Sequence, residues 1–179
     1  MFPLAFASPI NFSTKRWVTI AYFFTGCLCL ATIWCLIKYM SDPVAVNESY
    51  LRAKTMITPL ENDHVRFSLL VSIAIFICGY LWYYYPGIVI KNKIVLFFTA
   101  GWLIIFLHLL AARTGLISFY IMVLALVIKL IFSKNSHRLS FAFLGLIIFF
   151  PVLAYLFIPS FQNRVKFFLY EKEYFVRSN

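Results

Sequence analysis

The stretch HLLAARTGLISFY, residues 108–120, decides how this chain folds, because it places a histidine and an arginine inside a long apolar run. The run extends over 39 residues, from Ile94 to Phe132. A straight helix of that length would measure about 58 Å, whereas the hydrocarbon core of a bilayer is about 30 Å thick. The run must therefore turn back on itself. Its midpoint, RTG at 113–115, combines a cation, a hydroxyl and a flexible glycine, so we expect a tight helical hairpin there.

The composition of the whole chain predicts an integral membrane protein. Of its 179 residues, 63% are hydrophobic and only 12% are charged, and the mean hydropathy is +0.89. Soluble domains have about 25% charged residues, so a soluble helical bundle is the weaker interpretation. The net charge of +10 would indicate nucleic acid in a soluble protein, but here the basic residues lie in short segments between apolar runs. We expect membrane lipids or a phosphate-bearing substrate as partners, and no nucleic acid.

The apolar runs predict an all-α polytopic protein, a single membrane domain over residues 1–179. Five transmembrane helices are expected, at about 17–39, 66–85, 94–112, 116–132 and 139–158. The polar loop 41–64 holds four of the six acidic residues, and Asp63 is expected to cap the second span. Pro151 predicts a kink in the fifth span. Segment 160–179 mixes aromatic and charged residues, so we expect an amphipathic helix at the membrane surface.

Five spans place loop 41–64, the hairpin tip and the C-terminal segment on one side of the membrane, together with all six acidic residues. Basic residues occur on both sides in similar numbers, so the positive-inside rule does not decide the orientation. Arg66 begins the second span, Arg113 lies at the hairpin tip, and Arg164 follows the fifth span. Guanidinium groups hold phosphate oxygens with paired hydrogen bonds. Three of them on one side indicate a pyrophosphate site.

Each of these residues also has an ordinary structural interpretation. Arg113 fits a charge that fixes the membrane boundary, Arg66 a flanking residue that extends to the interface, and Arg164 a contact with solvent or lipid headgroups. His64 is a candidate for proton transfer and equally a residue of the helix start, whereas His108 fits a hydrogen-bonded histidine inside the bundle. No set of His, Cys, Asp or Glu has the spacing of metal ligands, and no glycine-rich phosphate loop occurs, so no metal or other cofactor is expected.

Two motifs resemble a known family. LLAARTGLISFY at 109–120 resembles the span-turn-span signature of the O-antigen ligase and O-antigen polymerase family, bacterial membrane glycosyltransferases in which an arginine and small residues begin a span. NDHVRFSL at 62–69 is similar to the loop-to-span junction of O-antigen ligase-like proteins. The resemblance implies a GT-C-like membrane fold and a multi-pass location in the bacterial inner (cytoplasmic) membrane. It also implies that the side with the acidic residues, including loop 41–64, faces the periplasm.

The resemblance further implies an activity. Such enzymes transfer a glycan from undecaprenyl pyrophosphate to an acceptor sugar, which is the lipid A core for ligases and a growing polysaccharide for polymerases, without a nucleotide sugar or a required metal. By this resemblance Arg113 and Arg66 would be catalytic, because they would stabilise the charge on the departing pyrophosphate, and Arg164 would be a further pyrophosphate ligand. A base would activate the acceptor hydroxyl, and His64 is the candidate for proton transfer.

The sequence also departs from the family pattern. Family members have more spans and a large periplasmic loop with a histidine, whereas this sequence ends at Asn179, where that loop would begin. We therefore expect a fragment of a longer protein or a reduced relative, and in either case these residues need not be active alone. The alternative from another class is a non-catalytic transporter or lipid-handling subunit, whose arginines bind anionic headgroups or a translocated anion.

Overall fold

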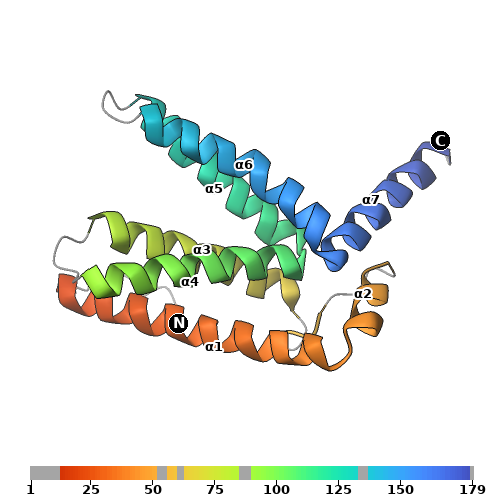
Figure 1. Cartoon of the computed structure of the whole chain (residues 1–179), viewed down its shortest axis with the longest axis horizontal. Helices are drawn as coiled ribbons and strands as arrows, with labels where there is room; N and C mark the ends of the chain where they lie inside the picture. The colour runs from red at the N-terminus through yellow and green to blue at the C-terminus, as the bar shows by residue number, and fades with distance from the viewer. Residues whose placement is uncertain (1–12, 52–55, 60–62, 85–89, 133–136, 178–179) are drawn as a thin grey trace, which may run out of the picture.

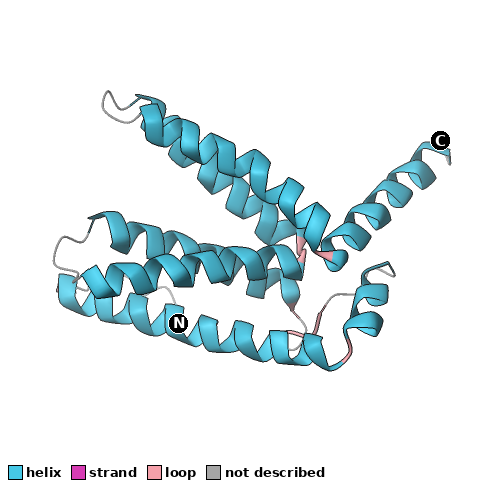
Figure 2. Ribbon diagram, in the orientation of Figure 1, coloured by secondary structure: helices cyan, strands magenta, loops and turns pink. Residues whose placement is uncertain are grey.

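The structure, a computed structural model, describes residues 13–51, 56–59, 63–84, 90–132 and 137–177, and its regular structure there is entirely helical. Figure 1 shows the helices, and Figure 2 shows that only short loops and turns join them where the chain is described. Their bounds are α1 (Thr14–Ser41), α2 (Pro43–Leu51), α3 (His64–Tyr84), α4 (Ile90–Leu110), α5 (Arg113–Phe132), α6 (His137–Phe157) and α7 (Pro159–Arg177). The prediction of an all-α chain is confirmed.

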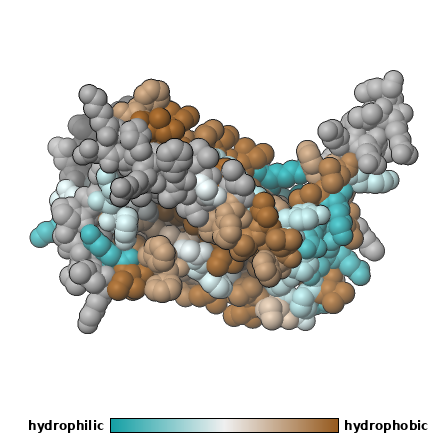
Figure 3. Space-filling model, turned by 45° about the horizontal axis from the view of Figure 1, so that its top comes forward, coloured by the Kyte–Doolittle hydropathy of each residue, from teal (hydrophilic) through white to brown (hydrophobic). Residues whose placement is uncertain are grey.

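Four of these helices, α1, α3, α4 and α5, are long and apolar enough to cross a membrane. Many of their large apolar side chains lie on the outside of the molecule, for example Phe23, which is 73% exposed, and Phe132, which is 85% exposed. In water this surface would be unfavourable, whereas lipid accepts it. Figure 3 shows hydrophobic side chains over the middle of one face and hydrophilic ones at its two ends. Helix α6 covers the fifth expected span, which stays a prediction because its side chains are described only in part.

The helices meet at one end of the molecule. Here α1 passes into α2, α3 begins, α4 turns into α5, and α6 turns into α7 (Figure 1). We call this region the α2 end, and the region where α3 ends and α4 begins the opposite end. Helix α3 packs against α1, α4 and α5, while α7 contacts α2, α4 and α6. The segments that carry the three arginines are therefore at the same end, as the five-span topology predicts.

The turn between α4 and α5 lies two residues earlier than predicted. Helix α4 ends at Leu110 and α5 already begins at Arg113, so the connection consists of Ala111 and Ala112. Ala111 has a φ of 47°, in the left-handed region, which costs a residue other than glycine roughly 1–2 kcal/mol. The expected hairpin is therefore confirmed, but its placement at residues 113–115 was wrong. Arg113 is the first residue of a helix and not the tip of a loop.

Gly115 serves close packing of two helices instead of the turn. A Cβ atom at this position would lie 2.3 Å from the Cβ of Ser68 and 2.6 Å from its Oγ. The hydroxyl of Ser72 donates a hydrogen bond of 3.0 Å to the carbonyl of Gly115. Helices α3 and α5 can approach this closely because glycine has no side chain, a packing typical of membrane helices. This contact fixes the start of α5, and with it Arg113, against α3.

The segment predicted as loop 41–64 contains the nine-residue helix α2. Asp42 caps it, because one carboxylate oxygen accepts a hydrogen bond of 3.1 Å from the amide of Ala45. Pro43 occupies the first helical position, where its fixed φ and missing N–H are favourable. Asp42 and Pro43 therefore begin a helix, where we expected a loop.

The prediction that Asp63 caps the second span is confirmed, since its carboxylate accepts a hydrogen bond of 3.0 Å from the amide of Arg66.

The chain changes direction between α6 and α7, where Pro159 begins the second helix. The chain bends between Phe157 and Pro159, and the side-chain amide of Gln162 donates to the carbonyl of Tyr155 at 2.7 Å. Pro159 has no N–H to continue the hydrogen bonds of α6, so α7 leaves in a new direction (Figure 1). The expected C-terminal helix is confirmed. Pro151 lies inside α6, and the kink expected there stays a prediction.

Candidate anion-binding site

Two hydroxyl groups hold the last carbonyls of α4 and attach α2 and α7 to it. The Tyr50 hydroxyl on α2 donates to the carbonyl of Leu110 at 3.1 Å, and the Ser160 hydroxyl on α7 donates to the carbonyl of Leu109 at 2.9 Å. The last four carbonyls of a helix have no partner within the helix, so such donors stabilise its end. As a result, α2 and α7 are held at the point where α4 turns into α5.

Tyr50 is fully buried in this cluster, and its oxygen also accepts a hydrogen bond of 3.4 Å from the amide of Met56. Burial raises the pKa of Tyr50, while the Met56 amide and the positive charge of Arg164 act in the opposite direction with smaller effects. The phenol therefore remains protonated at neutral pH and acts as a donor. The charge of Arg164 is close enough to act on this hydroxyl.

Arg164 lies one helical turn after Ser160, so both side chains are on the face of α7 that is directed at α4 and α2. The Nε and Nη1 atoms of Arg164 are buried. One residue earlier, the side-chain amide of Asn163 donates to the backbone carbonyl of Asn47 on α2 at 2.9 Å, and the Tyr39 hydroxyl donates to the Asn47 side chain at 3.1 Å. We interpreted Arg164 as a residue near solvent or headgroups. The structure instead places its guanidinium inside the junction of α2, α4 and α7.

Arg113 and Arg164 come together at one aromatic ring. The Arg113 Cζ atom lies 6.0 Å from the centroid of the Phe167 ring, and the Arg164 Cζ atom lies 5.8 Å from the same centroid. Arg113 is also 5.0 Å from the centroid of Phe168. Cations at these distances from a ring face are attracted by its electron density. Two residues separated by 51 positions in the sequence thus place their guanidinium groups against the same ring, and Arg113 belongs to the first turn of α5.

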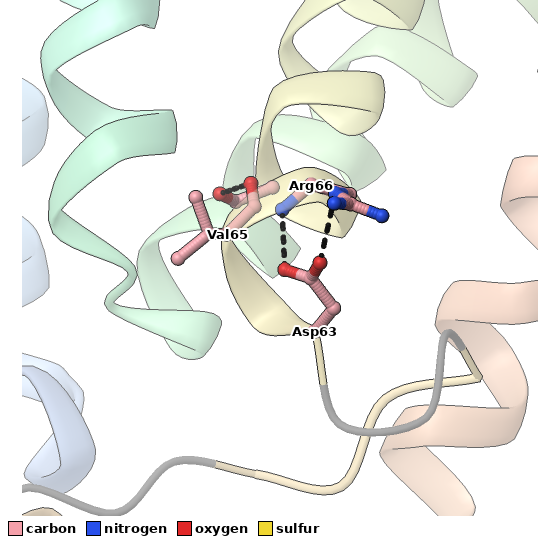
Figure 4. Close-up of polar contacts among 4 residues, drawn as sticks. Asp63, Val65 and Arg66 are labelled. Atoms are coloured by element: carbon pink, nitrogen blue, oxygen red, sulfur yellow. Dashed lines mark hydrogen bonds and ion pairs between the residues drawn. The ribbon is translucent and has the colours of Figure 1, made fainter.

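Arg66 is placed differently from this pair. Its Nε atom forms a salt bridge of 3.0 Å with Asp63, three residues earlier, and its side chain is 81% exposed. Figure 4 shows the guanidinium extending away from the start of α5. The structure therefore brings Arg113 and Arg164 together but does not bring Arg66 to the same ring. The role of Arg66 stays a prediction.

The two candidate histidines, His64 and His108, have different environments. His64 is the first residue of α3 and is half-buried beside the capping residue Asp63. His108 is 1% exposed, with Nδ1 2.8 Å from the carbonyl of Ile104 and Nε2 2.6 Å from the hydroxyl of Tyr120. Because a carbonyl only accepts, Nδ1 carries the proton and Nε2 accepts from Tyr120. His108 is therefore the hydrogen-bonded interior histidine that the sequence indicates, and the role of His64 in proton transfer stays a prediction.

Within the described part of the chain, no three His, Cys, Asp or Glu side chains are close enough together to hold a metal ion.

No family model, no curated protein and no solved structure matches this chain. The candidate site is therefore defined by the geometry of its own residues. Its members are Arg113, Arg164, Phe167 and Phe168, supported by Tyr50 and Ser160.

Removal of the Tyr50 hydroxyl tests whether its hydrogen bonds stabilise the helices that form this site. We expect Tyr50→Phe to lower the free energy of unfolding by about 1–3 kcal/mol, because the Leu110 carbonyl and the Met56 amide each lose a buried partner. Thermal unfolding of the detergent-purified protein measures this change. Tyr170→Phe is the matched control, since Tyr170 is 69% exposed, and its effect should stay within about 0.5 kcal/mol. Equal stability of the two variants would contradict the role of the Tyr50 hydroxyl.

The same hydroxyl predicts a dependence on pH. The folded state raises the pKa of Tyr50 above the value of about 10 in the unfolded chain. Its contribution to stability is therefore complete below about pH 10 and is lost as the pH rises towards the folded-state pKa. Between pH 9 and 11 the wild-type protein should lose more stability than Tyr50→Phe in the same unfolding measurement. Parallel curves for the two proteins would contradict this account.

Proposed function

We propose that the chain is the membrane part of an O-antigen ligase-like glycosyltransferase. It binds the pyrophosphate of an undecaprenyl-linked glycan at its α2 end, and the glycan is transferred to an acceptor sugar of the lipid A core or of a growing polysaccharide. The observation that carries the proposal is the placement of the Arg113 and Arg164 guanidinium groups against the same ring, that of Phe167. The motif around Arg113, LLAARTGLISFY, supplies the chemical class of the ligand.

The electrostatics of the site favour an anion with more than one charge. Two guanidinium groups near each other repel, and an anion that accepts hydrogen bonds from both offsets this repulsion. Helix α5 begins at Arg113 with no acidic residue in its first turn, so the positive end of its dipole adds to the same potential. The pyrophosphate of a lipid-linked glycan carries one negative charge on each of two adjacent phosphate groups. It can therefore contact both arginines at once.

The same geometry supports a catalytic role. When the glycosyl bond breaks, negative charge increases on the departing pyrophosphate. Donors that are already in place stabilise this charge in the transition state more than in the bound substrate. The close packing at Gly115 and the hydroxyl contacts of Ser160 fix the elements that carry Arg113 and Arg164 before substrate binds. His64 is the proposed group for proton transfer at the acceptor hydroxyl.

The proposal includes the location and the fold of the protein. The chain would belong to a GT-C-like fold in the bacterial inner membrane, with the α2 end at the periplasmic face. The amphipathic helix α7 would lie near that face, which fits its apolar residues Phe168 and Leu169, both about half exposed. The second candidate is a non-catalytic transporter or lipid-handling subunit. The same arginine pair would then bind lipid headgroups or a translocated anion.

Binding of undecaprenyl pyrophosphate to the detergent-purified protein tests the proposal. We expect Arg113→Lys and Arg164→Lys each to weaken binding about tenfold or more, because a charge-assisted hydrogen bond contributes roughly 1.5–3 kcal/mol. Arg66→Lys is the matched control at the same end and should change the affinity less than about fivefold, as expected for an exposed ion pair. Unchanged affinity in all three variants would contradict the site. Phosphatidylglycerol that binds as tightly as undecaprenyl pyrophosphate, and whose binding Arg113→Lys and Arg164→Lys weaken equally, would favour the second candidate.

A further inference from the structure

A groove at the opposite end of the molecule has the composition of a lipid site. It lies between the last turn of α3 and the first turns of α4, has a volume of about 440 Å³, and is lined by Trp82, Lys93, Ile94, Phe97 and Phe98. Four of the five side chains are apolar, and Lys93 is the one cation among them. The groove contains none of the residues of the arginine site. Its occupant is therefore a separate question from the proposed function.

Along the membrane normal, the groove residues follow the order of a phospholipid, with the cation at the headgroup and the aromatic rings at the acyl chains. Lys93 is the second residue of the candidate membrane span Asn92–Leu110, so we expect it at the membrane boundary. Phe97 follows one helical turn later on the same face, about 6 Å deeper along the helix axis. Trp82 lies in the last turn of α3, and tryptophan favours the boundary between water and lipid. A cation at the depth of headgroups is thus followed by apolar rings at the depth of acyl chains.

The two phenylalanines form an open apolar wall. Their ring centroids are 6.0 Å apart with an interplanar angle of 79°, an edge-to-face arrangement. Phe97 is 68% exposed and Phe98 is 70% exposed, so the protein itself covers little of either ring. In a bilayer, acyl chains contact such surfaces. An acyl chain beside this wall would keep its headgroup near Lys93.

The charge of this end selects an anionic headgroup. All six acidic residues of the sequence lie in residues 42–63 or in α7, whereas Lys15 and Arg16 at the start of α1 and Lys93 at the start of α4 are basic. A surface of this sign attracts anionic lipids and gains little from zwitterionic ones. We propose that the groove binds an anionic phospholipid, with Lys93 contacting the headgroup phosphate and Phe97 and Phe98 contacting one acyl chain.

Lipid retention measured by native mass spectrometry of the detergent-purified protein tests this site. Phosphatidylglycerol is the anionic probe, and phosphatidylcholine with the same acyl chains is the zwitterionic one. Lys93→Gln should weaken phosphatidylglycerol binding about fivefold, which corresponds to about 1 kcal/mol for one lysine near an anionic lipid, and leave phosphatidylcholine unchanged. Phe97→Ala should weaken both lipids similarly, because both share the acyl chain.

Two matched control variants distinguish a specific lipid site from general attraction between the protein surface and lipids. Lys15→Gln removes an exposed cation from the same end, and Phe23→Ala removes a phenylalanine of α1 that is 73% exposed. Neither control should change the affinity measurably. Equal losses in Lys93→Gln and Lys15→Gln, or equal binding of the two lipids by the wild-type protein, would overturn the proposal. Failure here would leave undecaprenyl pyrophosphate binding at Arg113 and Arg164 unaffected, because these residues lie at the other end.

Discussion

Under the proposed function, replacement of Arg113 by lysine is expected to reduce glycan transfer from undecaprenyl pyrophosphate about 100-fold or more. Lysine keeps the positive charge but has no planar pair of donors, so it cannot hold two phosphate oxygens in fixed positions. Loss of one pre-positioned donor to a developing negative charge lowers a rate by roughly 10²–10³-fold. The measurement follows transfer of the lipid-linked glycan in membranes that contain the protein in its natural context.

Arg66→Lys is the control for this experiment, because Arg66 belongs to the same end but pairs with Asp63. Transfer should remain within about fivefold of the wild-type rate for that variant. If Arg66→Lys loses as much activity as Arg113→Lys, Arg66 belongs to the site, as the family resemblance implies. If Arg113→Lys transfers glycan at the wild-type rate, Arg113 has no part in the reaction.

Substitution of Gly115 by alanine is expected to have the largest effect on the fold. The new Cβ would lie 2.3 Å from the Cβ of Ser68 and 3.0 Å from its backbone carbonyl carbon, so α3 and α5 must move apart. Overpacking of this kind costs about 1–3 kcal/mol, and the movement would also displace Arg113. We expect a clearly lower unfolding temperature in detergent together with weaker binding of undecaprenyl pyrophosphate.

Gly101 offers a matched control, since a Cβ at this position in α4 would meet no atom within 4 Å. Gly101→Ala should therefore be neutral or stabilising by up to about 1 kcal/mol, through the higher helix propensity of alanine. The double variant Ser68→Gly with Gly115→Ala should recover part of the lost stability, because it removes the closest contact. Equal stability of Gly115→Ala and Gly101→Ala would contradict the close packing of α3 and α5.

The length of the apolar runs predicted most of the fold. The 39 residues from Ile94 to Phe132 had to turn near their middle, and the structure confirms a turn at Ala111 and Ala112. Its exact place could not be predicted, because glycine serves both turns and close helix contacts. Only the position of Ser68 shows which of the two applies to Gly115. Helix α2 was missed because residues 41–64 were expected to form a polar loop, although a proline directly after the cap Asp42 begins a helix.

The candidate site was predicted in part. Sorting the charges by membrane side selected Arg66, Arg113 and Arg164, and the structure brings two of them together. The difference depends on which way each side chain points, which the spacing of spans does not determine. Ser160 and Arg164, four residues apart, share a helix face, but only the hydrogen bond of Ser160 to α4 shows that this face is directed inward. Tyr50 had no signal in the sequence, because its partner, the end of α4, is 60 residues away in the sequence.

The central claim is that Arg113 and Arg164 bind one pyrophosphate together. A double-mutant cycle tests it most directly, with the affinity for undecaprenyl pyrophosphate measured for the wild type, Arg113→Lys, Arg164→Lys and the double variant. We predict that the effects of the two substitutions are not additive, with a coupling of about 1 kcal/mol or more, as for residues that share one partner. Undecaprenyl monophosphate should show a smaller coupling. Additive effects for the pyrophosphate, or an affinity unchanged in the double variant, would contradict the account.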